Sequence, residues 1–266
     1  MNEDIITTFD DSRVTPFARL VHDDKRELET FVAEGENVVL RLLESRFAVR
    51  TVLCVDAKAG RIRPHLQANT TLLIAEKKLI QQIVGYNFNA GVLAIAERAE
   101  LPPLSFLTDD LQSASRSFLV LPEITNAANF GALLRTAAAF GVDRVLLGEQ
   151  CRSPFNRQTV RTSMGTIFAL RIARSVNLKE DLLTLRSLGV TTIATVLDAD
   201  APALPTVARP RHLALLMGEE GPGLPRYIMD LCDQRTTIPM SLGTDSLNVA
   251  SAAAVFLYHF QQALKE

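Results

Sequence analysis

Five uninterrupted apolar runs in the second half of the chain limit its fold more than any other feature. A strand with one face in water alternates apolar and polar residues, whereas these runs do not alternate. Strands buried on both faces and separated by helical segments such as "LKEDLLTLRSLG" form a parallel α/β sheet. The sequence therefore predicts a mostly parallel α/β domain over residues 117–266, with strands at 118–124, 144–148, 166–172, 191–197 and 212–218.

The first hundred residues form a smaller pattern of the same class. Strands are predicted at 49–55, 71–76 and 91–97, and helices at 35–45 and 77–85, which together indicate a small α/β sandwich over 1–100. Residues 101–116 mix proline, acids and serine without periodicity, so we expect a linker there. The first fifteen or so residues look too polar to pack, and we expect them to be disordered.

Composition excludes several classes of protein. No stretch approaches the about 18 apolar residues of a membrane span, and the acidic start lacks the basic region of a signal peptide. The three cysteines are far apart and have no CxxC spacing, which is typical of reduced thiols in the cytoplasm. The four histidines are equally scattered, so we expect no metal site. The absence of a long apolar stretch leads us to expect no membrane association.

The net charge of −2 does not indicate a nucleic-acid-binding protein, but the basic residues are unevenly placed. Arginines and lysines dominate 46–78, and six arginines lie in 144–174. Each segment is either a solvated face or a surface for phosphate groups, and both interpretations stay open. The candidate phosphate contacts are Arg46, Arg50, Arg61, Arg63, Arg152, Arg157 and Arg161.

Ligands of parallel α/β sheets collect at the carboxyl ends of the strands, and three polar stretches are predicted there. The first, 122–137, leads into a helix for which Asn129 is a plausible N-cap and Gly141 a stop. Gly131 and Arg135 lie on one side of this helix, outside its apolar stripe. Taken alone, Arg135 is an exposed arginine on an ordinary helix.

The second stretch, "MGEEGPGL" (217–224), is a glycine loop that carries two carboxylates. Glu219 and Glu220 would repel a phosphate, so hydroxyl groups or a positive charge suit this loop better. The third stretch, 238–256, runs from a strand end through polar residues into an apolar helix. Ser246 and Asn248 are, in isolation, ordinary helix-capping residues.

Together and in this order, "NFGALLRTA", "MGEEGPGL" and "IPMSLGTDSLNVA" closely resemble the three motifs of the SpoU (TrmH-like) RNA ribose 2′-O-methyltransferases of the SPOUT superfamily. "RTSMGTIF" (161–168) is similar to a further family stretch, although Thr166 stands where alanine is more usual. Asn126–Ala127 replaces the family's usual Asp-Pro. The resemblance covers about 117–266, and "FVAEGENVVLRLLES" is similar to the L30e-like substrate-binding domain that often precedes it.

The resemblance implies an S-adenosylmethionine-dependent enzyme that methylates ribose 2′-hydroxyls of structured RNA (rRNA or tRNA). It implies a C-terminal trefoil knot and a homodimer formed through the catalytic domain. Arg135 matches the catalytic arginine, which acts either as a base or, protonated, as an electrostatic stabiliser. The other implied catalytic residues are Asn129, Glu220, Ser246 and Asn248, and the implied cofactor residues are Thr195, Gly218, Gly223, Ile238, Met240 and Leu247.

Two other functions remain to be weighed. A non-catalytic RNA-binding or ribosome-assembly protein with this fold is compatible with Asn126–Ala127 and with the acidic pI of 6.1. A dinucleotide-dependent oxidoreductase needs GxGxxG after the first strand and an acidic residue about 20 positions further on. The glycine loop lies near the end of the chain without that spacing, which excludes this class.

Overall fold

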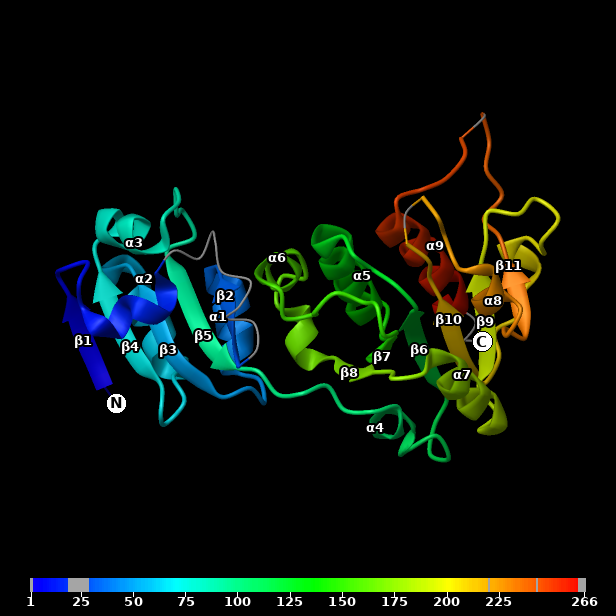
Figure 1. Cartoon of the computed structure of the whole chain (residues 1–266), viewed down its shortest axis with the longest axis horizontal. Helices are drawn as coiled ribbons and strands as arrows, with labels where there is room; N and C mark the ends of the chain where they lie inside the picture. The colour runs from blue at the N-terminus through cyan, green and yellow to red at the C-terminus, as the bar shows by residue number, and fades with distance from the viewer. Residues whose placement is uncertain (1, 19–28, 220, 243, 263–266) are drawn as a thin grey trace. The chain divides into compact units, whose positions relative to one another are not determined.

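The computed structural model describes residues 2–18, 29–219, 221–242 and 244–262 (Figure 1). They form two compact units. Unit 1 comprises Met1–Glu100 and Pro154–Phe168, and unit 2 comprises Leu101–Ser153 and Ala169–Glu266. Unit 1 therefore includes a stretch that the sequence assigns to the second half. In the described part of the chain, no helix is long and apolar enough to cross a membrane.

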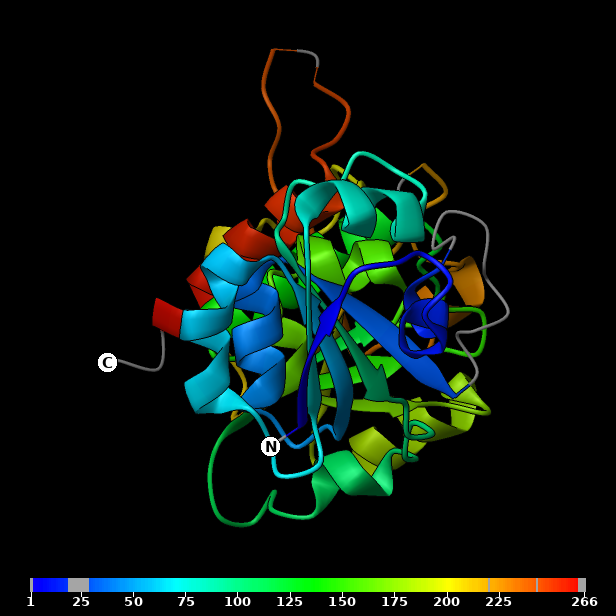
Figure 2. The same cartoon turned by 90° about the vertical axis from the view of Figure 1, so that its left-hand side faces the viewer.

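Unit 1 contains a five-stranded mixed sheet in the order β1-β4-β3-β5-β2 (Figures 1 and 2). The predicted strands and helices of this half are all present. The strands are β1 (Asn2–Ile6), β2 (Thr30–Glu34), β3 (Val49–Cys54), β4 (Thr71–Ala75) and β5 (Val92–Glu97), and the helices are η1 (Ser12–Phe17), α1 (Glu36–Leu43), α2 (Asp56–Ile62), η3 (Arg63–His65) and α3 (Lys77–Val84).

The prediction that the start of the chain is disordered is wrong for residues 2–17. β1 pairs in parallel with β4 at the edge of the sheet, so the ladder satisfies the backbone groups on the side of β1 that faces β4. Ile6, Val14 and Phe17 are buried and anchor the segment in the core of unit 1. Polar side chains are compatible with an edge strand because one edge and one face of it remain in water.

The stretch Pro154–Phe168 belongs to unit 1 because its aromatic residues complete a cluster there. The ring of Phe31 stacks on Phe155 at 5.1 Å and on Phe168 at 5.8 Å between centroids, and Phe47 packs edge-on against both. The stretch forms α6 (Arg157–Thr162) and most of η4 (Thr166–Ala169). The predicted strand at 166–172 is therefore wrong in its first half, and β8 begins at Arg171.

Unit 2 contains a six-stranded sheet in the order β11-β9-β10-β6-β7-β8, and every pairing in it is parallel. This confirms the parallel sheet expected from the apolar runs. The strands are β6 (Arg116–Leu121), β7 (Arg144–Leu147), β8 (Arg171–Arg174), β9 (Thr191–Thr195), β10 (His212–Leu216) and β11 (Gln234–Thr236), and the helices are α4 (Ser105–Thr108), α5 (Ala127–Ala139), α7 (Leu178–Ser187), η5 (Leu204–Thr206), α8 (Arg226–Met229) and α9 (Val249–Gln262).

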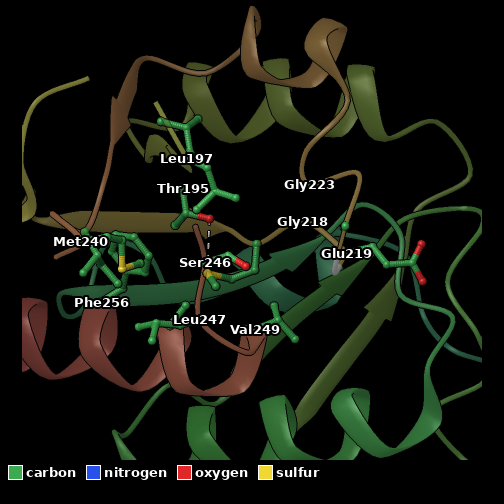
Figure 3. A pocket seen from close by; sticks show the side chains of 15 residues that line it. Thr195, Leu197, Gly218, Glu219, Gly223, Met240, Ser246, Leu247, Val249 and Phe256 are labelled. Atoms are coloured by element: carbon green, nitrogen blue, oxygen red, sulfur yellow. Dashed lines mark hydrogen bonds between the residues drawn. The ribbon is translucent and has the colours of Figure 1, made fainter. Parts of the chain in front are cut away.

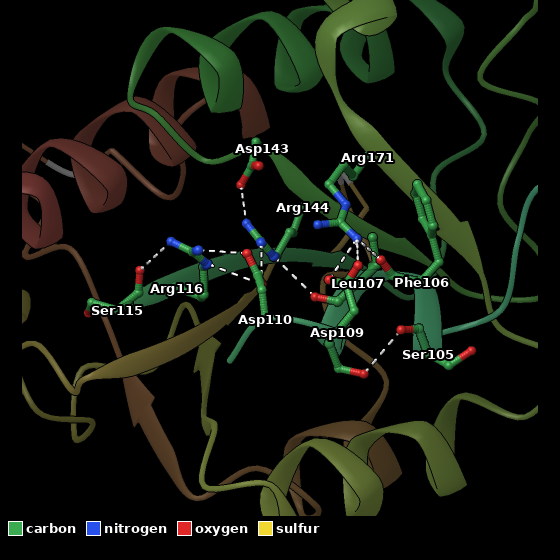
Figure 4. A network of polar contacts seen from close by, with 11 residues as sticks. Ser105, Phe106, Leu107, Asp109, Asp110, Ser115, Arg116, Asp143, Arg144 and Arg171 are labelled. Atoms are coloured by element: carbon green, nitrogen blue, oxygen red, sulfur yellow. Dashed lines mark hydrogen bonds and ion pairs between the residues drawn. The ribbon is translucent and has the colours of Figure 1, made fainter. Parts of the chain in front are cut away.

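The segment 101–116, predicted as a linker, packs into unit 2. Leu104, Leu107 and Leu111 are buried in its core at helical spacing around α4. The buried guanidinium of Arg144 donates to the carbonyl oxygen of Leu107 and pairs with Asp110 at 2.6 Å (Figure 4). The leucines are three and four residues apart, as on a helix, but the prolines and acidic residues around them are typical of a linker, which is why a linker was expected.

Candidate functional site

A cavity lies at the carboxyl ends of β9 and β10 in unit 2 (Figure 3). Its interior volume is about 140 Å³. Its walls are mostly apolar, with Leu197, Met217 and Phe256 among them. The structure brings together here all six predicted cofactor residues and one predicted catalytic residue, namely Thr195, Gly218, Gly223, Ile238, Met240, Leu247 and Ser246.

The glycine loop forms one wall of this cavity and folds back on itself. The N–H of Gly223 donates to the carbonyl oxygen of Glu219 at 2.9 Å. A Cβ atom added to Gly218 would lie 2.3 Å from the carbonyl carbon of Gly223, so any side chain there would force the backbone apart. The two ends of the loop therefore approach each other more closely than any residue except glycine at position 218 allows.

Glu219, the described carboxylate of this loop, points away from the cavity (Figure 3). Its Oε1 atom accepts a hydrogen bond from the backbone N–H of Thr125 at 2.9 Å and another from the Thr125 hydroxyl. The expectation that this acid faces ligand hydroxyls therefore does not hold for Glu219. Glu220, the loop acid that was predicted to be catalytic, lies outside the described residues.

Helix α5 begins three residues earlier than predicted, because Asn126 and not Asn129 is its N-cap. The Asn126 side-chain oxygen accepts hydrogen bonds from the N–H groups of Ala128 (2.9 Å) and Asn129 (3.1 Å). Asparagine thus supplies the side-chain acceptor that a helix N-cap requires. The departure at Asn126 preserves the start of the helix.

The side chain of Asn129 is consequently available to contact another motif. Its Oδ1 atom accepts a hydrogen bond from Nδ2 of Asn248 at 3.2 Å. This bond joins the first turn of α5 to the residue before α9, and the two helices pack along each other. Two predicted catalytic residues that are 119 positions apart are thus in direct contact.

Arg135 lies on the exposed face of α5. Its guanidinium makes no hydrogen bond or ion pair with another described residue. The structure therefore brings Ser246 to the cavity, joins Asn129 to Asn248, and leaves Arg135 accessible to an outside group.

Of the predicted phosphate contacts in the first hundred residues, Arg63 is half-buried and the others are exposed, and most of them already have an acidic neighbour. Arg50 pairs with Glu97 at 3.1 Å, Arg61 with Glu36 at 2.6 Å and Arg63 with Glu3 at 2.7 Å. The guanidinium of Arg46 lies 5.2 Å from the centroid of the Phe47 ring. The Arg50–Glu97 pair is exposed on both sides and contributes little free energy, so Arg50 can exchange its carboxylate for a phosphate at small cost. The carboxylate that holds Arg61 is largely buried.

The arginines of 144–174 divide into two groups. Arg144, Arg171 and Arg174 are held inside unit 2, by Asp110, Asp109 and a set of backbone carbonyl groups respectively, so the structure contradicts a phosphate surface that includes all six. Arg152 and Arg161 are exposed.

Arg157 is intermediate between these two groups. Its guanidinium stacks 4.5 Å from the ring centroid of Tyr86 and lies 3.5 Å from the buried carboxylate of Glu34. Burial, reinforced by Glu34, raises the pKa of the Tyr86 hydroxyl. Arg157 is therefore part of the packing of unit 1, and only its exposed portion is available to a ligand.

Metal-binding side chains do not converge in the described part of the chain, where no group of three or more His, Cys, Asp or Glu could hold an ion. Two of the three cysteines are buried. Burial raises the pKa of the Cys54 thiol to about 12 and that of Cys151 to about 11, which keeps both in the unreactive protonated form.

Comparison with known proteins identifies relatives over nearly the whole chain. Residues 116–258 match the SpoU rRNA Methylase family. An uncharacterized tRNA/rRNA methyltransferase of Mycobacterium bovis is 35% identical over 258 residues, which cover 94% of this chain and 88% of the relative. The 23S rRNA (guanosine(2553)-2′-O)-methyltransferase RlmP of Bacillus subtilis is 26% identical and covers 90% of this chain and 91% of its own.

The crystal structure of an AdoMet-bound rRNA methyltransferase from Sinorhizobium meliloti superimposes with a TM-score of 0.83 at 26% identity. The alignment covers 98% of both chains, so it includes both compact units.

Proposed function

This chain belongs to the SpoU rRNA methylase family, and we propose that it transfers a methyl group from S-adenosylmethionine to a ribose 2′-hydroxyl of ribosomal or transfer RNA. One observation carries the proposal most directly. The apolar cavity with its tight glycine loop borders the same segment, Ser246–Asn248, that is bonded to Asn129 on the arginine-bearing helix α5. A hydrogen bond thus connects the segment at the proposed cofactor cavity to the helix that we propose faces the substrate.

The cavity suits S-adenosylmethionine on chemical grounds. Apolar side chains such as Leu197 and Phe256 offer surfaces for a flat base, and the main chain around Gly218 offers hydrogen-bonding groups without a phosphate nest. The residues that we expect to hold the cofactor are Thr195, Gly218, Gly223, Ile238, Met240 and Leu247. When bound, the cofactor supplies a methyl group on a positively charged sulfur atom.

The chain's own residues then have to position the RNA. A ribose hydroxyl is a weak nucleophile, and correct placement alone supplies a large part of the rate. We assign Arg135 to the phosphate beside the target ribose, where it would offset developing negative charge, because it is exposed and has no acidic partner among the described residues. Ser246 and the Asn129–Asn248 pair would orient the ribose from the cavity rim.

The finer assignments are proposals of the same kind. Unit 1 would present structured RNA through Arg46, Arg50, Arg61 and Arg63, together with Arg152 of unit 2 and Arg157 and Arg161 of α6. The catalytic domain would dimerise through α9, where Val255 and Tyr258 are 42% and 56% exposed although the helix is apolar nearly all round. A cytoplasmic location follows from an RNA substrate, and the family's trefoil knot is expected in the C-terminal segment.

The deciding experiment follows labelled methyl from S-adenosylmethionine into total cellular RNA. We expect label at ribose 2′-oxygens with the wild type, and a loss of at least about a hundredfold with Arg135→Ala at unchanged cofactor affinity. Arg186→Ala, an exposed arginine on α7, is the matched control and should retain full activity. Cofactor binding without transfer into any RNA would favour a non-catalytic RNA-binding protein, and no cofactor binding would refute the proposal.

A further inference from the structure

A second hollow lies at the opposite end of the unit 2 sheet from the cofactor cavity. Arg116, Arg144 and Arg171 are the first residues of β6, β7 and β8, so three parallel strands begin at its wall. It encloses about 710 Å³, counting its open mouth. The lining residues are Asp110, Ser115, Arg116, Ser117, Gly141, Asp143, Arg144, Arg171 and Arg209.

The residues that line this hollow include four arginines but only two aspartates, so its wall carries excess positive charge. The ion pairs around it neutralise some of these arginines but not all of them. Asp110 bridges Arg116 and Arg144, with 2.6 Å from a carboxylate oxygen to each guanidinium (Figure 4). The hydrogen bond from Arg116, joined by one from Arg144, holds the pKa of Asp110 well below its usual range. Arg144 also pairs with Asp143 at 2.6 Å. Two carboxylates therefore fix and neutralise these two arginines, which form a rigid wall.

Arg209 is the cation that this network leaves uncompensated. It donates to the hydroxyl oxygens of Ser115 (3.1 Å) and Ser117 (2.9 Å) and to a backbone carbonyl group, but no carboxylate pairs with it among the described residues. Partial burial lowers its pKa, because the charged form is taken out of water without a counter-charge. An anion in the hollow would relieve that penalty.

Arg171 adds donors on the other side. Its Nη2 atom is bonded to Asp109 and to the Phe106 carbonyl oxygen, and the guanidinium stacks 4.6 Å from the Phe106 ring centroid. Its Nε and Nη1 atoms donate to no described residue (Figure 4). The Ser115 hydroxyl already donates to the carbonyl oxygen of Arg211, whereas no described acceptor takes the proton of the Ser117 hydroxyl. The hollow thus has excess positive charge, spare guanidinium donors and the Ser117 hydroxyl in a rigid frame.

We propose that this hollow binds a phosphate group, at a site separate from the methyl-transfer cavity. Guanidinium forks match phosphate oxygens geometrically, and a doubly charged group gains more than a carboxylate from an excess of arginines. Gly141 leaves the rim open, because a Cβ atom there would meet no atom within 4 Å. The phosphate belongs either to an RNA backbone or to a free phosphorylated molecule, and the test separates these sources.

Gly141 allows two substitutions that differ from each other only in charge. Its φ of +72° is a left-handed conformation that asparagine and aspartate both tolerate. Gly141→Asp places a carboxylate at the rim, and Gly141→Asn is its neutral isostere. Inorganic pyrophosphate is titrated calorimetrically at low ionic strength into both variants and the wild type. We expect Gly141→Asn to match the wild type and Gly141→Asp to bind at least about tenfold more weakly.

The second arm measures filter binding of ribosomal RNA to the same proteins over a range of salt concentrations. If pyrophosphate does not bind but Gly141→Asp weakens RNA binding relative to Gly141→Asn, the phosphate is that of an RNA backbone. Arg209→Gln should reproduce the loss in whichever arm responds. Equal affinities of Gly141→Asp and Gly141→Asn in both arms would overturn the proposal, whatever the methyl-transfer assay shows.

Discussion

Glu219, at the rim of the cofactor cavity, accepts two hydrogen bonds from Thr125, the residue before the N-cap of α5. One carboxylate oxygen thus holds the glycine loop to the loop that starts the arginine-bearing helix. The charge of Glu219 is directed at the protein and not at the cavity (Figure 3). This contact predicts that the two loops keep their spacing only while an acceptor stands at position 219.

Replacing that acceptor should impair catalysis more than folding. We expect Glu219→Ala to lower kcat/KM for RNA methylation by about ten- to a hundredfold, since small displacements of reacting groups have effects of that size. Glu219→Gln keeps an acceptor oxygen and should stay within about threefold of the wild type. Thr125→Val combined with Glu219→Ala should be no worse than Glu219→Ala alone. If Glu219→Gln were as defective as Glu219→Ala, the charge and not the hydrogen bond would matter.

Gly218→Ala tests the tight packing of the glycine loop. The new Cβ atom would lie 2.3 Å from the Gly223 carbonyl carbon, so the loop must shift and the cavity wall with it. We expect the Kd for S-adenosylmethionine, measured by calorimetry, to rise at least about tenfold. Gly60→Ala is the control, because nothing lies within 4 Å of a Cβ atom there. Unchanged cofactor affinity in Gly218→Ala would argue against this loop as a cofactor contact.

The cap of α5 gives a stability prediction. Asn126→Ala removes the acceptor for two N–H groups and should lower the free energy of unfolding by about 0.5–2 kcal/mol, measured by urea denaturation. Asn126→Asp should be neutral or stabilising, because a carboxylate also favours a helix N-terminus. A destabilised Asn126→Asp variant would mean that the asparagine amide group has a second role.

The Asp110 bridge predicts a pH dependence with a definite sign. The pKa of Asp110 is depressed in the folded state, so the stabilisation it gives is fully present above its unfolded value near 4 and is lost as pH falls below that. Asp110→Asn should therefore be less stable than the wild type at pH 7, and the difference should shrink between about pH 4 and pH 2. A difference that stays constant over this range would show that ionisation of Asp110 is not what stabilises the bridge.

Several elements were predictable because the sequence pattern that specifies them lies within the element itself. The apolar runs identified the parallel sheet, and strand ends followed by glycine or polar residues identified the cavity. Other elements were not. β1 is a polar edge strand whose stability comes from its partner β4, and α4 is a single turn anchored by three leucines. The N-cap of α5 is Asn126 and not the predicted Asn129. Asparagine is a favoured N-cap residue at either position, so the sequence alone did not separate the two.

The sequence by itself determined the parallel sheet of unit 2 and the edge at which a ligand would lie, because burial on both faces of a strand requires an apolar run and parallel strands bring their carboxyl ends to one edge. The resemblance of three motifs to a known family indicated the family and the residues that line the cavity. Only the tertiary structure decided where the charged side chains point. Asp110, which pairs with Arg144, and Thr125, which donates to Glu219, lie 34 and 94 positions away from them, and no local pattern encodes such pairs. A buried or shared charge is stabilised by whatever the fold brings beside it, which the chain's periodicity does not specify.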